Sequence, residues 1–310
     1  MNVIEGLDTL SPPFVNSAVA IGAFDGIHVG HQAIIRTAVK DARQQNRTAI
    51  VLTFDRRPAT VIDPERAAPY LTTPKQRIRL IGELQPDVLV VAKFDSSIYE
   101  LSPEAFLQQV LKDKLGAKTI VVGNNFFFGK NRAGDIDYLQ RSQTAYDFTL
   151  DALEPVSVNG VMASSTRIRE LLRAGDVQEA ERILGHPYLL AGKVVQGQKL
   201  GRTLGFPTAN LDLTVRQLVP LDGIWAVQVF LDDGRTLKGA CSIGNRPTIE
   251  GAGRSIETFL FDFNEDIYGT EIELQFVKYI RPEQKFDSLD SLVVQMKSDV
   301  EVAKKALREI

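Results

Sequence analysis

The sequence contains few cysteine, tryptophan, methionine and histidine residues: its 310 residues include one Cys, one Trp, three Met and three His. The single cysteine, Cys241, excludes an internal disulfide framework and is typical of proteins in a reducing cytoplasm. Long apolar runs are also missing, since runs such as 88–92 are far too short to cross a bilayer. The N-terminus lacks the basic and apolar pattern of a signal peptide. We therefore expect a cytoplasmic protein with no signal peptide and no membrane segment.

Positive charge is not in excess either. Lys and Arg number 36 against 39 Asp and Glu, which gives a net charge of −3 and a pI near 5.8. A dedicated nucleic-acid-binding protein normally has a basic face, so we expect no nucleic-acid partner. The hydrophobic content of 44% and the length are ordinary for a chain of two globular domains.

Two sequence patterns divide the chain. Up to residue 184, short apolar runs alternate with segments of helical spacing, which predicts an α/β domain with a parallel sheet. From residue 185 on, strand patterns separated by turn signals predict a small antiparallel barrel, and 288–307 has the pattern of an amphipathic helix. We therefore predict domains 1–184 and 185–310. The expected strands are 17–21, 49–54, 88–94, 119–123, 189–195, 225–231, 237–243, 255–263 and 271–279, and the expected helices include 73–84, 103–115 and 177–184.

The stretch IGAFDGIHVGH (21–31) joins a buried strand to a helix through a turn with three glycines. It places His28 and His31 where a helix N-terminus offers free N–H groups to an anion. A zinc site is a weak interpretation, because the chain has too few other histidines and cysteines. Structural histidines are a second alternative. The pattern favours a third, a pair that stabilises charge on the phosphoryl oxygens of a nucleoside triphosphate.

A polar and aromatic loop follows the strand expected at 119–123, in the sequence GNNFFFGK (123–130). One interpretation is a strand end followed by an aromatic plug in the core. The other is a ligand loop, in which Asn125 holds a nucleotide and the aromatic rings stack on a ring system. The sequence favours neither.

Hydroxyl side chains and two arginines open the helix expected at 170–173, in the sequence SSTRIR (164–169). Hydroxyls at this place are by default N-caps. Arg167 and Arg169 are unusual there, because the helix dipole disfavours cations in the first turn. A bound polyphosphate would remove this conflict, so the phosphate interpretation is favoured.

The barrel half has its own glycine-rich segment at 197–211. Its candidates for wrapping phosphates are Gly197, Lys199, Gly201, Arg202 and Gly205. Thr208 and Asn210 lie two residues apart, so in an extended segment both side chains point the same way and suit Mg²⁺. The alternative is a flexible hairpin loop.

Eight segments, taken together and in this order, resemble those of the bifunctional prokaryotic riboflavin kinase/FMN adenylyltransferases, also called FAD synthetases. They are GAFDGIHVGHQ (22–32), LTTPKQR (71–77), VVGNNFFFGK (121–130), SSTRIRELLRAGDVQEAERILGHPY (164–188), GRTLGFPTANL (201–211), IGNRPTI (243–249), IETFLFDFNEDIYG (256–269) and RPEQKFDSLDSL (281–292). The resemblance implies a Rossmann-like nucleotidyltransferase domain followed by a β-barrel riboflavin kinase domain with a terminal helix.

The resemblance also implies two consecutive reactions. The carboxyl-terminal domain would phosphorylate riboflavin with ATP to give FMN. The amino-terminal domain would join FMN to AMP from a second ATP, which gives FAD and pyrophosphate. The implied ligands are riboflavin, FMN, ATP and Mg²⁺, with a weak homo-oligomer as one option.

The roles of site residues follow from the same resemblance. The implied catalytic residues are Glu257 as general base of the kinase and His28 and His31 on the triphosphate. The implied ATP and phosphate contacts of the first domain are Gly22, Phe24, Gly30, Ser164, Ser165, Thr166 and Arg169. In the kinase, Thr208 and Asn210 would hold Mg²⁺ and ATP phosphates. The implied flavin contacts are Asn125, Phe126, Phe128, Arg281 and Phe286.

Two positions depart from the family pattern: Arg57 precedes Pro58, where a histidine is more usual, and Phe127 replaces an arginine. Both lie in the first domain, so a riboflavin kinase with an impaired adenylyltransferase is one alternative. A flavin-binding regulator without turnover is another. For Glu257, the alternative to a catalytic base is a solvated charge on a strand. The hydrophobic periodicity around Glu257 does not decide between these two interpretations.

Overall fold

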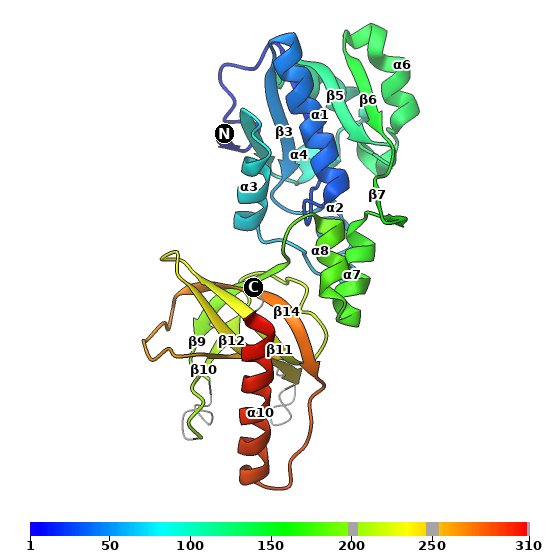
Figure 1. The fold of residues 1–310 in the computed structure, drawn as a ribbon. Coiled ribbons are helices and arrows are strands. Elements are labelled where there is room, and N and C mark those ends of the chain that lie inside the picture. Colours follow the sequence, from blue (N-terminus) through cyan, green and yellow to red (C-terminus); the bar gives the residue numbers. More distant parts are fainter. Residues whose placement is uncertain (198–203, 246–253, 309–310) are drawn as a thin grey trace. The chain divides into compact units, whose positions relative to one another are not determined.

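A computed structural model describes residues 1–197, 204–245 and 254–308 of the chain. The chain divides into two compact units, Met1–Ala68 with Pro74–Ser165 and Pro69–Thr73 with Thr166–Ile310. The predicted fold class is confirmed, since the first unit is built on a parallel sheet and the second on an antiparallel barrel with a terminal helix (Figure 1). The second unit begins upstream of residue 184, and the boundary between 184 and 185 stays a prediction.

A six-stranded parallel sheet organises the first unit, with the strand order β1-β4-β3-β2-β5-β6. Its strands are β1 (Asn2–Glu5), β2 (Ser17–Ile21), β3 (Thr48–Phe54), β4 (Val88–Ala92), β5 (Ala117–Gly123) and β6 (Thr149–Leu153). From β2 the chain runs outward through β3 and β4, then returns to β5 on the other side of β2. The order therefore reverses between β2 and β5, and ligands bind beyond the carboxyl ends of strands at such a point. The loops after β2 and β5 are the HxGH loop and the GNNFFFGK loop.

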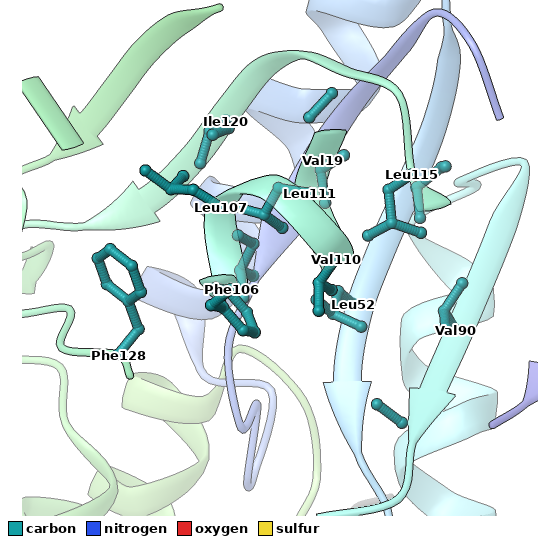
Figure 2. Packing of buried hydrophobic residues seen from close by; sticks show 14 of the residues in the cluster. Val19, Leu52, Val90, Phe106, Leu107, Val110, Leu111, Leu115, Ile120 and Phe128 are labelled. Carbon is teal, nitrogen blue, oxygen red and sulfur yellow. The ribbon is translucent and has the colours of Figure 1, made fainter. Parts of the chain in front are cut away.

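Helices cover the sheet because successive strand residues point to opposite faces. Val19 of β2 belongs to one hydrophobic cluster and its neighbour Ala20 to another. Figure 2 shows the first cluster, where residues of the π-helix η1 (Phe106–Lys114) pack against Val19, Leu52 and Ile120 of the sheet. The other helices and short strands of this half are α1 (Val29–Gln45), α2 (Pro58–Ile62), α3 (Pro74–Glu83), α4 (Ser96–Tyr99), α5 (Pro103–Ala105), the 3₁₀ helix η2 (Lys130–Arg132), α6 (Ile136–Tyr146), β7 (Ser157–Val158) and β8 (Val161–Met162).

A closed antiparallel barrel forms the second unit, with the strand order β10-β13-β12-β11-β14-β9 and pairing of β9 with β10. Its strands are β9 (Leu189–Val195), β10 (Thr208–Asp212), β11 (Gly223–Leu231), β12 (Thr236–Asn245), β13 (Arg254–Leu260) and β14 (Glu271–Arg281). Helices α7 (Ser165–Ala174) and α8 (Val177–Leu184) precede the barrel, and α10 (Leu289–Leu307) follows it. The Ser288 side chain caps α10, whose Ala303 and Leu307 pack with Ala226 of the barrel.

Residues Pro69–Thr73 belong to the barrel unit although they lie early in the sequence. The Gln217 side chain holds them, donating from Nε2 to the Leu71 carbonyl (3.0 Å) and to the Leu189 carbonyl (2.7 Å). The Tyr70 amide also donates to the Arg216 carbonyl at 2.8 Å. These contacts are nonlocal, so no sequence pattern indicated them.

Several predicted elements need correction. Helix α7 begins at Ser165 instead of residue 170, and β4 ends at Ala92 instead of residue 94. Strands β1, β6 and β10 and helix α6 were not expected as elements. Strand β6 lies at the sheet edge and is only partly buried, so it lacks the apolar run that marks an interior strand.

Candidate active sites

The two histidines of the HxGH loop form a stacked pair at the start of α1. His28 is the N-cap of this helix, and its Nδ1 accepts a hydrogen bond from the His31 amide (3.4 Å). The two imidazole rings stack with their centroids 3.6 Å apart, and the Phe24 ring meets His31 edge-on at 5.4 Å. The predicted arrangement of strand, glycine turn and helix is therefore present, with both rings held together at the helix N-terminus.

The backbone of this loop is strained at two residues other than glycine. Phe24 has φ 47° and the β-branched Ile27 has φ 42°, a conformation that such residues rarely adopt. Strain of this kind persists only where the surroundings enforce it, and it is concentrated at functional sites. The lack of a side chain at Gly22 allows the Phe24 ring to lie where it does, because a Cβ at position 22 would lie 2.8 Å from that ring. At Gly30 a Cβ would lie 3.1 Å from Cε1 of His28.

Burial sets the protonation state of His31. Burial, and secondarily the neighbouring His28, hold its pKa well below the ordinary value of 6.5. Its Nδ1 atom is buried and has no hydrogen-bond partner among the residues that the structure describes. His31 is therefore a neutral imidazole at pH 7.

This state of His31 predicts a loss of stability in acid. As the pH falls below 6.5, the unfolded chain takes up a proton that folded His31 does not, so unfolding becomes easier by up to about 1.4 kcal/mol per pH unit. The chain has three histidines, so their NMR resonances can be followed one by one as the pH is changed. We expect the pKa of His31 to lie well below 6.5, and His31→Gln to reduce the loss of stability. A His31 pKa at or above 6.5 would contradict this assignment.

Asp25, which is not among the predicted site residues, is a buried member of the same loop. Its carboxylate pairs with Arg57 at 3.1 Å, and the two side chains are 5% and 10% exposed. Its carbonyl accepts a hydrogen bond from the Ser165 hydroxyl (2.9 Å). Arg57, one of the two departures from the family pattern, thus binds the HxGH loop instead of pointing to solvent. Asp25 and Arg57 are far apart in the chain. The departure from the family pattern at position 57 was the one signal for this ion pair in the sequence.

The division into units falls inside the predicted SSTxxR phosphate motif. Ser164 and Ser165 belong to the first unit, and Thr166 and Arg169 to the second. Arg169 is buried, and its Nε donates to the Pro69 carbonyl at 2.8 Å. Thr166 is exposed. A phosphate contact of these four residues stays a prediction.

The loop after β5 has a buried and an exposed part. Phe128 packs in the core against Phe106 and stacks on Phe126, with ring centroids 5.6 and 5.7 Å away. Asn125 and Phe127 are exposed, and the Arg132 guanidinium lies over the Phe127 ring at 4.4 Å. Phe128 therefore packs in the core, as the aromatic-plug interpretation predicts. The flavin contacts of Asn125, Phe126 and Phe128 stay predictions.

A cavity of about 450 Å³ lies in the barrel unit, and Glu257 is on its wall. Ser255, Glu257 and Phe259 alternate along β13 and all line the cavity, while the residues between them are buried. The Thr208 hydroxyl donates to the Glu257 carboxylate at 3.3 Å. Glu257 is therefore held at a cavity wall and is not a freely solvated charge.

A second cavity of about 350 Å³ is lined by Gly197, Thr208 and Asn210. Thr208 thus lines this cavity as well as the 450 Å³ cavity. A Cβ at Gly197 would meet the amide group of Asn210, so a side chain there would displace the Asn210 side chain. Gly205 has φ 85° and does not line either cavity. The candidates Lys199, Gly201 and Arg202 lie outside the described residues.

Arg281 lies on the wall of the larger cavity and is anchored to α10. Its guanidinium makes two bonds to the Asp299 carboxylate, of 2.8 and 2.6 Å, and both side chains are largely buried. It lies 5.8 Å from the ring of Phe286, which lines the same cavity. Asp299 was not among the predicted site residues, although an acidic residue on the apolar face of a predicted helix is a usable signal.

Cys241 also lines the larger cavity. Burial raises the pKa of its thiol to about 12, and the charge of Glu257 also raises it. The side chain is thus a neutral, apolar part of the wall at pH 7.

Neither a membrane helix nor a preformed metal cluster is found within residues 1–197, 204–245 and 254–308. No helix there is long and apolar enough to cross a membrane. No group of three or more His, Cys, Asp or Glu side chains in those ranges is placed to hold a metal ion.

Comparison with known proteins assigns both halves of the chain. The family model of FAD synthetase matches residues 12–167, and that of riboflavin kinase matches residues 184–307. A protein from Streptococcus pneumoniae with a solved structure, described as a macrolide-efflux protein, is 34% identical, with a TM-score of 0.86 and coverage of 98% of this chain and 99% of that one.

Two curated relatives are described as bifunctional riboflavin kinase/FMN adenylyltransferases. The one from Haemophilus influenzae is 38% identical over 98% of both chains. The one from Escherichia coli K12 is 36% identical over 96% of both. With both domains matched over nearly the full length, this chain belongs to the bifunctional riboflavin kinase/FMN adenylyltransferase family and carries both activities.

Proposed function

We propose that riboflavin binds in the 450 Å³ cavity and ATP in the 350 Å³ cavity, and that phosphoryl transfer takes place where the two meet. The position of Thr208 carries this proposal, because Thr208 lines both cavities and donates to Glu257. Reacting groups bound on either side of Thr208 would lie close to the Glu257 carboxylate.

In this arrangement Glu257 is the general base of the kinase. A primary hydroxyl is a poor nucleophile, and a carboxylate within hydrogen-bond reach orients it and accepts its proton. The ribityl 5′-oxygen then forms a bond to the γ-phosphorus of ATP while the bond to the β–γ bridging oxygen breaks, so the products are FMN and ADP. Arg281 and Phe286 would border the flavin, since both line the larger cavity.

Thr208 and Asn210 would hold Mg²⁺ with the phosphates of ATP. Both supply side-chain oxygen atoms to the same cavity wall, and oxygen is the ligand that Mg²⁺ prefers. Few protein ligands are needed, because Mg²⁺ completes its shell with water and phosphate. When bound, the ion neutralises negative charge that develops on the phosphoryl oxygens.

In the first unit, His28 and His31 would contact the triphosphate of the second ATP. His28 accepts a hydrogen bond at Nδ1, so its neutral ring carries a proton on Nε2, which makes that atom a donor. The helix N-terminus at the same place favours negative charge. A phosphate oxygen of FMN attacks the α-phosphorus of ATP and pyrophosphate leaves. Donors at this place stabilise the charge on the α-phosphate during that step.

Several further assignments belong to the same proposal. They are phosphate contacts by Ser164, Ser165, Thr166 and Arg169 and flavin contacts by Asn125, Phe126 and Phe128. They also include domains 1–184 and 185–310, a cytoplasmic location, a weak homo-oligomer and no nucleic-acid partner. The single buried cysteine supports the cytoplasmic location.

The Mg²⁺ assignment predicts a defined effect of Thr208→Val, which removes the hydroxyl and keeps the shape of the side chain. Loss of a bond to a charged group costs roughly 1.5–3 kcal/mol, so we expect riboflavin phosphorylation to need about 10- to 100-fold more Mg²⁺. A titration of Mg²⁺ against the rate of FMN formation measures this. Thr208→Ser keeps the hydroxyl and is the control. An unchanged Mg²⁺ requirement in Thr208→Val would remove Thr208 from the metal site.

A further inference from the structure

Arg77 holds the backbone that carries the histidine pair. It lies in the first turn of α3 and is only 5% exposed. Its guanidinium donates to the Ala23 carbonyl (3.2 Å), to the Phe54 carbonyl (2.6 Å) and to the Asp55 carbonyl (3.3 Å). Ala23 follows β2, and Phe54 and Asp55 stand at the end of β3. One side chain thus ties together the loops at the carboxyl ends of two neighbouring strands.

The orientation of the Ala23 carbonyl affects the conformation of the HxGH loop. It accepts a second hydrogen bond from the Thr53 hydroxyl at 3.3 Å. The next residue is Phe24, which has the strained positive φ and whose ring meets His31 edge-on. Fixing the carbonyl fixes the peptide plane before Phe24, and so the ring that packs against His31.

Only an arginine side chain can make this set of contacts. A guanidinium presents several N–H donors in a planar fork, and here two of its nitrogens reach carbonyls on both loops. A lysine ammonium at the same place is a compact point charge and lacks this flat, rigid geometry.

We propose that Arg77 is a positioning residue for FMN adenylylation, which keeps the HxGH loop in its strained conformation and so sets the place of His31. This inference rests on the proposed role of His28 and His31. Arg77 acts on the adenylylation site only through the backbone, and no contact of its side chain with a substrate is proposed.

The test compares Arg77→Lys and Arg77→Met with Arg79→Lys, an exposed arginine on the same helix. A displacement of reacting groups by about 1 Å can cost 10²-fold in rate, so we expect the kcat of FAD formation from FMN to fall about 10²-fold in Arg77→Met. The KM for ATP should change less than threefold, riboflavin phosphorylation less than twofold, and Arg79→Lys should equal the unaltered protein.

NMR titration of the histidines separates positioning from general stability. His28 is the titratable group stacked on His31, and it is followed in the same spectra. In Arg77→Met the loosened loop admits water, so the His31 resonance should titrate closer to 6.5 than in the unaltered protein. A folded Arg77→Met protein with unchanged kcat and unchanged His31 titration would overturn the proposal.

A second variant keeps the proposal testable if the Arg77 variants do not fold. Thr53→Val removes the other donor to the Ala23 carbonyl, and we expect the kcat of FAD formation to fall severalfold; an unchanged kcat would overturn the proposal. Failure of the underlying site is distinguished by His28→Asn. If that variant still makes FAD at the full rate, the histidine site itself is wrong, whatever the Arg77 variants do.

Discussion

Glu257→Gln is expected to stop the conversion of riboflavin to FMN while leaving the conversion of added FMN to FAD intact. Glutamine has nearly the same shape as glutamate, so the hydrogen bond from Thr208 can be kept and the cavity wall stays filled. The amide cannot accept the proton of the ribityl hydroxyl. A positioned general base contributes about 10²–10⁴-fold, and we expect the kinase rate to fall by that factor.

Glu301→Gln is the matched control, since Glu301 is an exposed residue of α10 and does not line the cavity. Riboflavin binding, followed by the quenching of flavin fluorescence, should be changed little in Glu257→Gln. If Glu257→Gln phosphorylates riboflavin at more than a tenth of the normal rate, Glu257 is not the base.

His28→Asn is expected to have the opposite effect, with FMN made at the normal rate and FAD formation nearly lost. Removing one donor that stabilises a developing oxyanion costs about 10²–10³-fold in kcat. Asparagine is a good N-cap, so this variant keeps the start of α1 while it loses the imidazole. His28→Ala loses the cap as well, which costs about 1 kcal/mol of stability. Comparing the two separates the chemical role of the ring from its capping role.

His186→Asn is the control, because His186 is the remaining histidine of the chain, belongs to the barrel unit and has its Nδ1 against the Pro187 carbonyl. FAD formation by His28→Asn at the normal rate, with the protein folded, would show that the imidazole does not take part in adenylyl transfer.

Elements with strong local patterns could be predicted from the sequence. Strand β2, helix α8 and strand β9 have the predicted bounds. Strand β2 is a short run of buried residues, α8 is a clear amphipathic helix, and buried residues alternate with less buried ones along β9. Thr208 and Asn210, which lie two residues apart at the start of β10, both line one cavity.

Features that depend on residues distant in the chain could not be predicted. The sequence shows that His28 and His31 are three residues apart, but their stacking depends on a backbone with positive φ at Phe24 and Ile27, against the preference of both residues. The buried pairs of Asp25 with Arg57 and of Arg281 with Asp299 are likewise fixed by tertiary packing. Position 57, a departure from the family pattern, thus has a partner inside the first unit.

The central claim is that one chain carries out the two reactions in sequence at two separate sites. The most direct test incubates the pure protein with riboflavin, ATP and Mg²⁺ and separates riboflavin, FMN and FAD by chromatography over time. We predict that FMN rises first and then declines as FAD accumulates. Accumulation of FMN without any FAD would contradict the account for the first unit, and Arg57 and Phe127 would then be the first residues to replace by those usual in the family.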